Sequence, residues 1–379
     1  MWKRAIIIFH VLIMILMLTG CWNAVEIDQQ MNVSGIATDI GEQGRRYHIC
    51  AEIVAVSTRG GSGINVYVIE TEGDTIFESI RNLMTLTSKK LYFGHCKTMI
   101  IGEEIAKYGI SEILDMPIRD HELRMTMNIA VSKGCAAKEI LMTEGVSAPI
   151  ISYKIHDMIK NCEKVIGSAP YSKTYLVYNC IQTQGVCSVI PAVELQKIQN
   201  NKVLKLCGAG VFKKCKLVGF LNELQTKNLS FMNNKIRSGL LTFEAPESSY
   251  ADMSFEIYKS KTKTDISFDG SGITVNITVK TTAGIGEVGQ KANYSNFAEI
   301  EKTRNHLEKE MEKDFYLLIA TSQKDLHCDI FGIGMQISKH YPQKWEKYKD
   351  NWEETFPTVK FNVKSEVRIK GSGVVNRAA

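Results

Sequence analysis

The chain has 379 residues, of which 44% are hydrophobic and 23% are charged, and its formal net charge at pH 7 is +5. These values describe an ordinary globular protein that is long for a single core, which predicts two or three domains. The positive charges are spread along the chain in short clusters, without the concentrated basic face and stacking aromatics that nucleic-acid binding needs, so we exclude nucleic acid as a partner.

The first 20 residues have the layout of a bacterial secretory signal peptide. Lys3 and Arg4 precede an apolar run that reaches Leu18, and this run is shorter than the roughly 20 residues that a transmembrane helix needs. The following Leu-Thr-Gly-Cys resembles the lipobox of bacterial lipoproteins, which implies cleavage between Gly20 and Cys21 and lipidation of Cys21. We therefore expect a signal peptide over residues 1–20 and a mature protein tethered outside the cytoplasm by acyl chains such as palmitate.

Residues 21–190 predict an N-terminal α+β domain in which short strands alternate with helices. Two strand-like runs, 31–40 and 47–53, flank a Gly-containing turn and predict a hairpin. The sequence Thr75-Ile76-Phe77-Glu78 predicts a capping box, in which Thr75 caps a helix and Glu78 returns to the cap. We expect further strands at 66–70, 99–101 and 125–132, and further helices at 103–108, 111–116 and 136–143.

Residues 191–248 predict a small middle domain, with paired strands at 203–212 and 217–220 and a helix at 221–229. Residues 249–372 predict a C-terminal domain, because clean alternation of apolar residues follows residue 251 and helical apolar stripes follow residue 297. An antiparallel sheet with one face covered by helices explains this pattern, and we expect three such helices, along 297–318, over 329–339 and around 345–352. The whole mature chain is thus expected to have an α+β fold of three domains, with helices packed on mixed or antiparallel sheets.

The cysteines predict buried thiols rather than a metal site. With Cys21 assigned to lipid, nine remain, and the chain has no Cys-x-x-Cys pair and no Cys/His cluster with zinc-like spacing. Free cysteine behaves as a small buried hydrophobe, so we interpret most of the nine as core thiols. No metal and no cofactor is therefore predicted.

Three other sequence patterns could indicate a binding or catalytic site. Gly284-Ile285-Gly286-Glu287-Val288-Gly289 fits the Gly-x-Gly-x-x-Gly string of nucleotide sites, but Glu287 would repel a pyrophosphate, and a flexible connection is favoured. His95 and Cys96 are adjacent, so on a strand they face opposite sides and a structural histidine is favoured over a catalytic pair. The charged residues from Asp115 to Arg124 are interpreted as a solvated or internally paired ion network.

The aromatic stripe Trp345, Tyr348 and Trp352 has two readings. At helical spacing it fills the core of the C-terminal domain, which is the reading we favour. If exposed, it would be a partner surface, because large aromatics are enriched at interface hot spots.

Several blocks together resemble the Ger(x)C family of spore-germination lipoproteins. They are Cys21-Trp22-Asn23 with Glu26-Ile27, Gly73–Glu78, Lys89–His95, Ile118–Asp120, Gly208–Lys214 with Leu217–Leu221, Asp329–Gly334, Tyr341–Trp345 and Asn351–Pro357. The resemblance implies the C subunit of a nutrient germinant receptor, working with a multi-spanning A subunit and a transporter-like B subunit. It implies a lipoprotein on the outer face of the spore inner membrane, with three α+β domains, no cofactor and no catalytic residues, so that only Cys21 transfers as a site.

Two other functions stay open at this point. A substrate-capturing lipoprotein of a transporter would have two similar lobes around a cleft, whereas this chain has three dissimilar segments. A cell-wall enzyme would need paired acids or a Cys/His pair in a pocket. The sequence identifies neither the nutrient, nor whether this subunit binds it directly, nor the surface that meets the partner subunits.

Overall fold

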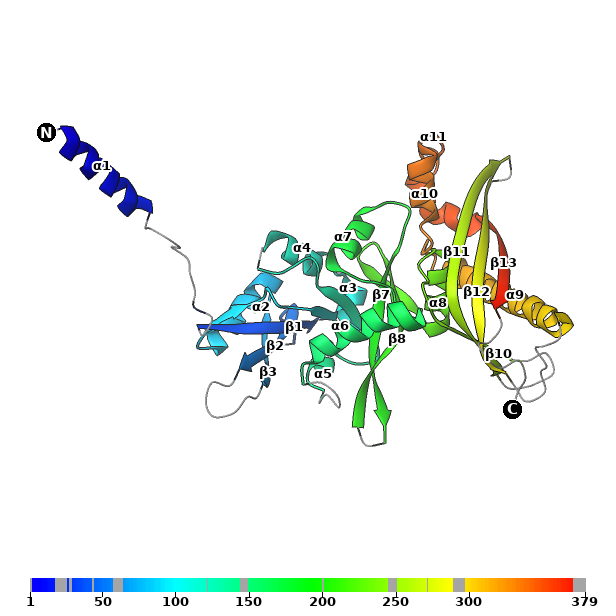
Figure 1. Ribbon diagram of the computed structural model, residues 1–379, viewed down its shortest axis with the longest axis horizontal. Helices are drawn as coiled ribbons and strands as arrows, with labels where there is room; N and C mark the ends of the chain where they lie inside the picture. Colours follow the sequence, from blue (N-terminus) through cyan, green and yellow to red (C-terminus); the bar gives the residue numbers. More distant parts are fainter. Residues whose placement is uncertain are drawn as a thin grey trace.

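The computed structural model describes residues 2–17, 26, 29–42, 44–56, 64–120, 122–143, 149–199, 201–244, 251–270, 272–288 and 297–370. Two β-sheets organise them, a large one from the strands up to residue 221 and a small one from the strands after residue 240 (Figure 1). The expected α+β class with mixed sheets is confirmed. Gly20 and Cys21 lie outside the described residues, so cleavage and lipidation there stay predictions.

The strands are β1 (Gln30–Ile40), β2 (Tyr47–Val56), β3 (Ile64–Gly73), β4 (Lys90–Tyr92), β5 (Thr98–Ile101), β6 (Asn128–Ser132), β7 (Ser188–Ile198), β8 (Asn201–Lys213), β9 (Lys216–Leu221), β10 (Leu240–Glu244), β11 (Ala251–Asp269), β12 (Gly272–Val288) and β13 (Lys360–Lys370). The helices are α1 (Trp2–Met17), α2 (Ile76–Leu83), α3 (Glu103–Tyr108), α4 (Ser111–Arg119), α5 (Ala137–Leu141), α6 (Ile151–Asn161), α7 (Thr174–Gln182), α8 (Glu223–Met232), α9 (Phe297–Ala320), α10 (Ile333–His340), α11 (Pro342–Trp345) and α12 (Trp352–Thr355). Within the described ranges, no helix combines the length and the apolar character that crossing a membrane requires.

The large sheet has the order β3-β2-β1-β5-β6-β7-β8-β9, and β4 also pairs with β1. The predicted hairpin is confirmed, since β1 and β2 pair antiparallel. At the centre β1, β5, β6 and β7 run parallel, and every residue of β5 and β6 is buried. Helices α2, α3, α4 and α7 pack on one face and α5 and α6 on the other, which is the double cover that parallel strands require.

The strands expected for a separate middle domain continue this large sheet. The predicted boundary at residue 190 falls inside β7, which pairs with β6 on one side and β8 on the other. The apolar residues of β8 from Leu204 to Phe212 are buried: Leu204, Leu206, Cys207 and Phe212 belong to the same cores as the earlier strands, whereas Val211 faces the core of the small sheet. The three-domain division itself stays a prediction, but the middle strands do not form a sheet of their own.

The small sheet has the order β10-β11-β12-β13, and its last pair corrects the antiparallel prediction. Strands β10, β11 and β12 are antiparallel, whereas β13 runs parallel to β12. The physical reason is the long connection between β12 and β13, which contains α9 and can return the chain to the same end of the sheet. The alternating pattern of β13 marks one buried face but carries no information about strand direction.

The third C-terminal helix expected around residues 345–352 is two short helices, α11 and α12. Residues seven apart on a straight helix are about 10.5 Å apart along its axis. The indole rings of Trp345 and Trp352 instead lie edge to face with centroids 5.4 Å apart, so the chain bends between them. The preceding helix, expected over 329–339, begins four residues later at Ile333.

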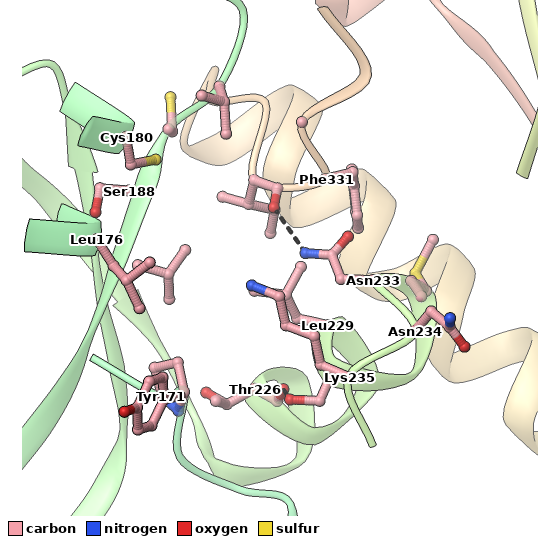
Figure 2. Close-up of a pocket in the computed structure, with 18 of the residues that line it drawn as sticks. Tyr171, Leu176, Cys180, Ser188, Thr226, Leu229, Asn233, Asn234, Lys235 and Phe331 are labelled. Atoms are coloured by element: carbon pink, nitrogen blue, oxygen red, sulfur yellow. Dashed lines mark hydrogen bonds between the residues drawn. The ribbon is translucent and has the colours of Figure 1, made fainter. Parts of the chain in front are cut away.

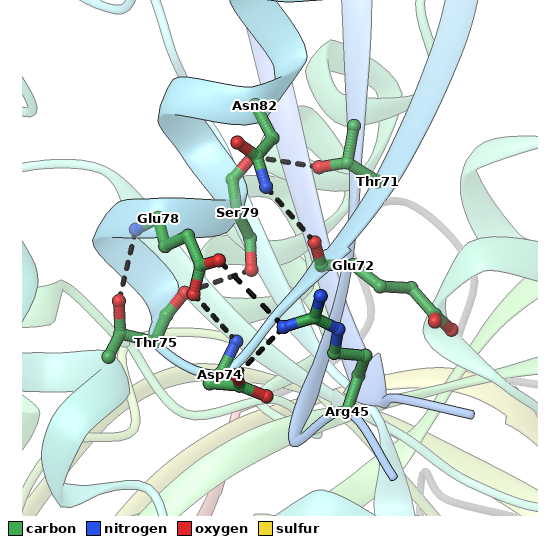
Figure 3. A network of polar contacts seen from close by, with 8 residues as sticks. All are labelled: Arg45, Thr71, Glu72, Asp74, Thr75, Glu78, Ser79 and Asn82. Atoms are coloured by element: carbon green, nitrogen blue, oxygen red, sulfur yellow. Dashed lines mark hydrogen bonds and ion pairs between the residues drawn. The ribbon is translucent and has the colours of Figure 1, made fainter. Parts of the chain in front are cut away.

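The predicted capping box at the start of α2 forms, except that Glu78 bonds to the residue before the cap and not to the cap itself (Figure 3). The Thr75 hydroxyl accepts from the N–H of Glu78 at 3.1 Å, as expected. The Glu78 carboxylate, however, accepts from the N–H of Asp74 at 2.9 Å, one residue before the cap. Arg45 from the β1–β2 turn pairs with the Asp74 carboxylate at 2.7 Å and thereby joins that turn to the start of α2.

Two carboxylates of the large sheet, the partly buried Asp39 and the buried Glu52, cap the helices α5 and α6 that pack on one face of the sheet. Asp39 of β1 accepts from the N–H groups of Ala137 and Lys138, each at 2.8 Å, and so caps α5. Glu52 of β2 accepts from the N–H of Ile151 at 2.6 Å and of Ser152 at 3.1 Å, and so caps α6. These contacts satisfy helix N–H groups that would otherwise be unpaired and fix both helices on the sheet.

Candidate functional site

A cavity lies where the large sheet meets the C-terminal unit (Figure 2). Its volume is about 900 Å³. Its walls come from α7 and the start of β7, from α8 and the turn after it, from β11, and from the segment that leads into α10. Elements far apart in sequence therefore build it jointly, and sequence periodicity alone could not have located it.

The cavity has an apolar floor and a polar rim. The floor consists of buried apolar side chains, namely Val177, Leu229, Met232, Ile236, Ile330 and Phe331. The rim carries amide, hydroxyl and basic side chains, namely Tyr171, Asn179, Ser230, Asn233, Asn234, Lys235, Arg237, Thr262, Thr264 and Gln336. An apolar pocket with a few convergent polar groups is the usual form of a small-molecule site.

The turn after α8 is fixed by its own side chains. Asn234 has φ +55°, a conformation that asparagine tolerates better than most residues. Its Oδ1 accepts from the N–H of Thr262 at 2.9 Å, while the amide of Asn233 donates to the carbonyl of Ile330 at 3.2 Å (Figure 2). The turn that presents Lys235 is thus bonded both to β11 and to the segment before α10.

The chemistry of the lining favours binding over catalysis. Among the described lining residues, Glu163 is the sole carboxylate and no histidine is present. Burial raises the pKa of the Cys180 thiol, and the hydrogen bond that the Cys187 thiol donates to the Cys328 sulfur, together with burial, raises that of Cys187. Both thiols are therefore protonated and poor nucleophiles at neutral pH. The exposed bases Lys235 and Arg237 make the rim suitable for a polar or anionic group.

The block Asp329–Gly334 borders this cavity and contains a buried carboxylate. Asp329 is 4% exposed, and its carboxylate accepts from the N–H of Ile333 at 3.1 Å, the N–H of Gly334 at 2.8 Å and the indole N–H of Trp352 at 3.2 Å. Burial raises the pKa of Asp329 to about 6, and the N–H donors oppose that shift. The Asp329 carboxylate thus caps the beginning of α10 and holds α12 against α10.

Gly334 lies at the contact between the two halves of the chain. A Cβ at Gly334 would lie 2.6 Å from the Cα of Gly185, in the loop before β7, and 2.7 Å from the Trp352 ring. The N–H of Met335 donates to the carbonyl of Gly185 at 3.0 Å, and the N–H of Cys187 donates to that of Asp329 at 2.8 Å. This sequence block therefore joins α10 to the large sheet.

The residues of the predicted aromatic stripe lie mainly in the core. Trp345 and Trp352 are each 6% exposed and belong to the core cluster of the small sheet, and Tyr348 is partly buried against it. The core reading favoured by the sequence therefore fits both tryptophans, and little of their surface is left for a partner. The other proposed site residue, Cys21, lies outside the described residues.

The glycine-rich string is part of a strand. Gly284 and Gly286 belong to β12, where Gly284 pairs with Glu256 of β11 and Gly286 lies at a register shift, so the expected flexible connection is wrong for this part of the string; Gly289 lies outside the described residues. A Cβ at Gly284 would meet the ring and hydroxyl of Tyr258. The close approach of that side chain explains the glycine without a phosphate.

His95, Cys96 and the charged segment from Asp115 to Arg124 make contacts that explain them structurally. His95 is exposed and stacks edge to face on Tyr92, whereas the adjacent Cys96 is buried and its thiol donates to the carbonyl of Thr98, so the two do not pair. In the charged segment, Arg119 pairs with Asp115, and Asp120 and Glu122 pair with Arg81 and Lys90 of other elements. The paired ion network predicted there is confirmed for these residues.

All nine remaining cysteines are free thiols, four of them buried and five partly buried. One of them, Cys50, stands beside His48 and Glu70, and these three side chains place possible ligand atoms within 4.8 Å of one another. Spacing along the sequence missed this group because strand pairing, and not a local motif, brings Glu70 to the other two.

Comparison with known proteins gives consistent matches along the chain. The family described as "Spore germination protein N-terminal domain" matches residues 23–195, and the one described as "Spore germination B3/GerAC like, C-terminal" matches residues 207–373. Spore germination proteins B3 and KC of Bacillus subtilis (strain 168) are 26% and 25% identical to it; the alignments cover 96% and 99% of this chain and 97% of each relative. Spore germination protein GerQC of Bacillus cereus is 23% identical, over 96% of this chain and 98% of the relative.

A solved structure supports the same fold. The crystal structure of the GerBC protein superposes with a TM-score of 0.56 at 22% sequence identity, covering 88% of this chain and 96% of that one.

Proposed function

This chain belongs to the Ger(x)C family of spore germination proteins, and from that membership we propose that it is the lipid-anchored C subunit of a nutrient germinant receptor. In this proposal it acts in spore germination together with an A and a B membrane subunit. Acyl chains on Cys21 hold it to the outer face of the spore inner membrane after residues 1–20 are removed.

The observation that carries the proposal is the extent and order of the two family matches. They follow one another over residues 23–195 and 207–373 and leave little of the mature chain unmatched. Relatives named as spore germination proteins align over nearly their whole length, so the likeness is not confined to one shared module.

A non-enzymatic role is supported by the cavity. Its lining offers one carboxylate, protonated thiols and two exposed bases, which can bind a molecule but supply no nucleophile with an adjacent base. The same cavity is the place in this subunit where a small polar nutrient could be held, should the subunit bind one directly.

Each of the two alternative functions would require a particular structural feature. A transporter's substrate-capturing lipoprotein would have two similar lobes, whereas the two sheets here differ in strand number, order and helix cover. A cell-wall enzyme would need converging catalytic groups, and the described cavity lining does not supply them.

The test is deletion of the gene in its spore-forming host, complemented by the wild-type gene. We expect spores that lose germination on particular nutrients but germinate normally when the receptors are bypassed, and crosslinking in spore membranes should recover peptides of an A and a B subunit. Normal nutrient germination with impaired nutrient uptake in growing cells would favour the transporter reading. Altered peptidoglycan would favour the enzyme.

A further inference from the structure

A histidine, a cysteine and a glutamate meet on the large sheet, outside the cavity. His48 and Cys50 are alternate residues of β2, so their side chains share one face of the sheet. Glu70 of β3 is the register partner of Cys50 and joins them on that face. In the part of the chain that the structure describes, this is the one group of three His, Cys, Asp or Glu side chains with all ligand atoms within 4.8 Å of one another.

The spacing of the three side chains matches that of ligands around one small cation. The Nε2 of His48 lies 3.1 Å from Oε2 of Glu70, and the Sγ of Cys50 lies 3.6 Å from the same oxygen. Tetrahedral Zn²⁺ with ordinary bond lengths to nitrogen, oxygen and sulfur places its ligand atoms about 3.3–3.6 Å apart. The three groups therefore need only small side-chain adjustments to accept the ion.

The cluster is buried on the side of Cys50 and His48 and exposed to solvent on the side of Glu70. Cys50 is fully buried and the His48 side chain is 10% exposed, whereas the Glu70 side chain is 46% exposed. An ion can thus enter past Glu70, and a fourth position faces solvent. Three charged groups on neighbouring elements lie beside the cluster: Asp39 and Glu72, the register partners of His48 on β1 and β3, and Lys138 of α5.

The charges of these groups suit a divalent cation. In the ion-free arrangement the Cys50 thiol donates a hydrogen bond to the Glu70 carboxylate, with Sγ and Oε2 3.6 Å apart. A bound cation would replace that proton, leaving a thiolate and a carboxylate to balance its two charges. Lys138 and Asp39 carry opposite charges and offset one another beside the cluster.

We propose that His48, Cys50 and Glu70 bind one Zn²⁺ ion through Nε2, Sγ and a carboxylate oxygen, with a fourth position open to water or to a donor from another molecule. Binding forms a Zn–S bond and releases the Cys50 thiol proton to solvent. The mixed donor set of thiolate and imidazole selects Zn²⁺ over Mg²⁺ and Ca²⁺, which prefer oxygen ligands. The ion ties β3, the edge strand of the large sheet, to β2.

The competing explanation is a plain His48–Glu70 ion pair with a thiol hydrogen bond beside it. That arrangement needs no metal and would leave Zn²⁺ unbound at equilibrium. The two explanations differ in stoichiometry, in the ligand atoms used and in proton release, all of which can be measured on the protein without any germination assay.

The test uses the full-length chain purified in detergent and equilibrated with Zn²⁺, with Co²⁺ as the spectroscopic probe. We expect one tightly held Zn²⁺ per chain, release of a proton on binding, and a thiolate-to-cobalt charge-transfer band. Cys50→Ser should abolish that band. His48→Gln and Glu70→Gln should each weaken Zn²⁺ binding at least about tenfold, since even outer partners of metal ligands cost about 10–100-fold when mutated.

The matched controls are Cys96→Ser, a buried thiol that donates to the Thr98 carbonyl, and Glu72→Gln, the next acid on the same face of β3, whose carboxylate accepts from the N–H of Glu42. Both should bind Zn²⁺ as the wild type does. Absence of stoichiometric Zn²⁺ in the wild type would overturn the proposal, and so would binding that persists in Cys50→Ser and His48→Gln. If the two β2 variants fail to fold, Glu70→Gln at its exposed position decides alone: unchanged affinity there rejects the site.

Discussion

The indole N–H of Trp352 donates to the buried carboxylate of Asp329 at 3.2 Å. Asp329 also accepts from the N–H groups of Ile333 and Gly334, so a single side chain starts α10 and holds α12 against it. These residues belong to the block that most specifically resembles the Ger(x)C family. The structure gives that block a structural explanation: it joins α10 to α12 and to the loop before β7.

Trp352→Phe should destabilise the protein because it keeps an aromatic ring and removes one donor from a buried carboxylate. We expect the free energy of unfolding to fall by about 1.5–3 kcal/mol, the usual value of a hydrogen bond to a charged group. Urea unfolding of the purified chain measures this. Trp345→Phe is the matched control, since Trp345 is equally buried but is not a donor to Asp329. Equal losses in both variants would contradict the role given to the indole N–H.

The pH dependence of stability should carry the signature of Asp329. Its pKa is raised from 3.8 to about 6 in the folded protein, so the native state binds the proton more tightly than the unfolded chain does. The resulting stabilisation is complete below about pH 4 and is lost as the pH rises through 6, on the order of 2–3 kcal/mol in all.

The measurement is urea unfolding between pH 4 and pH 7 for the wild type and for Asp329→Asn. Asparagine does not titrate, so the variant should lack this contribution, and the difference between the two profiles isolates it from other shifted groups such as Asp39. The variant should also be less stable throughout, because its amide NH₂ would face N–H donors. Parallel profiles would show that Asp329 does not titrate in this range.

Gly334→Ala should disrupt the contact between the two halves of the chain. The new Cβ would lie 2.6 Å from the Cα of Gly185 and 2.7 Å from the Trp352 ring, and neither backbone nor buried indole can move freely. We expect a loss of about 1–3 kcal/mol, typical of overpacking. Gly286→Ala in β12 is the control: its Cβ would approach nothing closer than 3.4 Å, so it should cost at most about 1 kcal/mol and leave germination near normal. Thermal unfolding of both variants compares them.

Much of the local structure could be predicted from the sequence because it depends on local patterns. The hairpin of β1 and β2, the cap at Thr75 and the apolar stripe of α9 follow from turn residues, capping residues and periodicity. Strand direction could not be predicted in the same way. The alternation in β13 is identical for a parallel and an antiparallel neighbour, and only the crossover through α9 decides between them.

The sites escaped prediction for a related reason. The cavity is built by four stretches of chain that meet only in the folded protein. The group of His48, Cys50 and Glu70 depends on the register between β2 and β3, because a shift of one residue would turn Glu70 to the other face of the sheet. The family resemblance identified the blocks around Asp329 and Trp352 but could not say that they contact each other.

Cys21→Ala tests the anchor. The change removes the thiol that would carry the acyl chains, and with it the hydrophobic energy of about 0.8 kcal/mol per buried methylene that holds the chain to the bilayer. We expect either an uncleaved precursor or a protein that is released from the membrane fraction of spores, and impaired germination. Intact mass spectrometry of the wild-type protein is the decisive check: an unacylated chain with a different N-terminus would reject lipidation at this residue.

The last prediction concerns the edge of the small sheet. Three side chains of α9 accept from alternate N–H groups of β13: the Tyr316 hydroxyl from Val363 at 3.0 Å, Glu312 from Ser365 at 2.8 Å and Glu308 from Val367 at 2.7 Å. The spacing of the three acceptors along α9 matches the spacing of the three N–H groups along β13, because four residues of a helix and two of a strand both advance about 6–7 Å. The helix therefore covers an edge strand that could otherwise pair with another chain.

Replacing both glutamates with alanine should expose that edge. We expect each substitution to cost about 1–3 kcal/mol, because a buried N–H loses its acceptor, and the double variant to self-associate. Glu310→Ala is the control, as Glu310 lies on the same helix but pairs with Lys313 on the surface. Urea unfolding and light scattering of the purified chains measure both effects. A double variant that stays monomeric and as stable as the control would mean that α9 covers β13 through apolar packing of Leu307, Met311 and Phe315 alone.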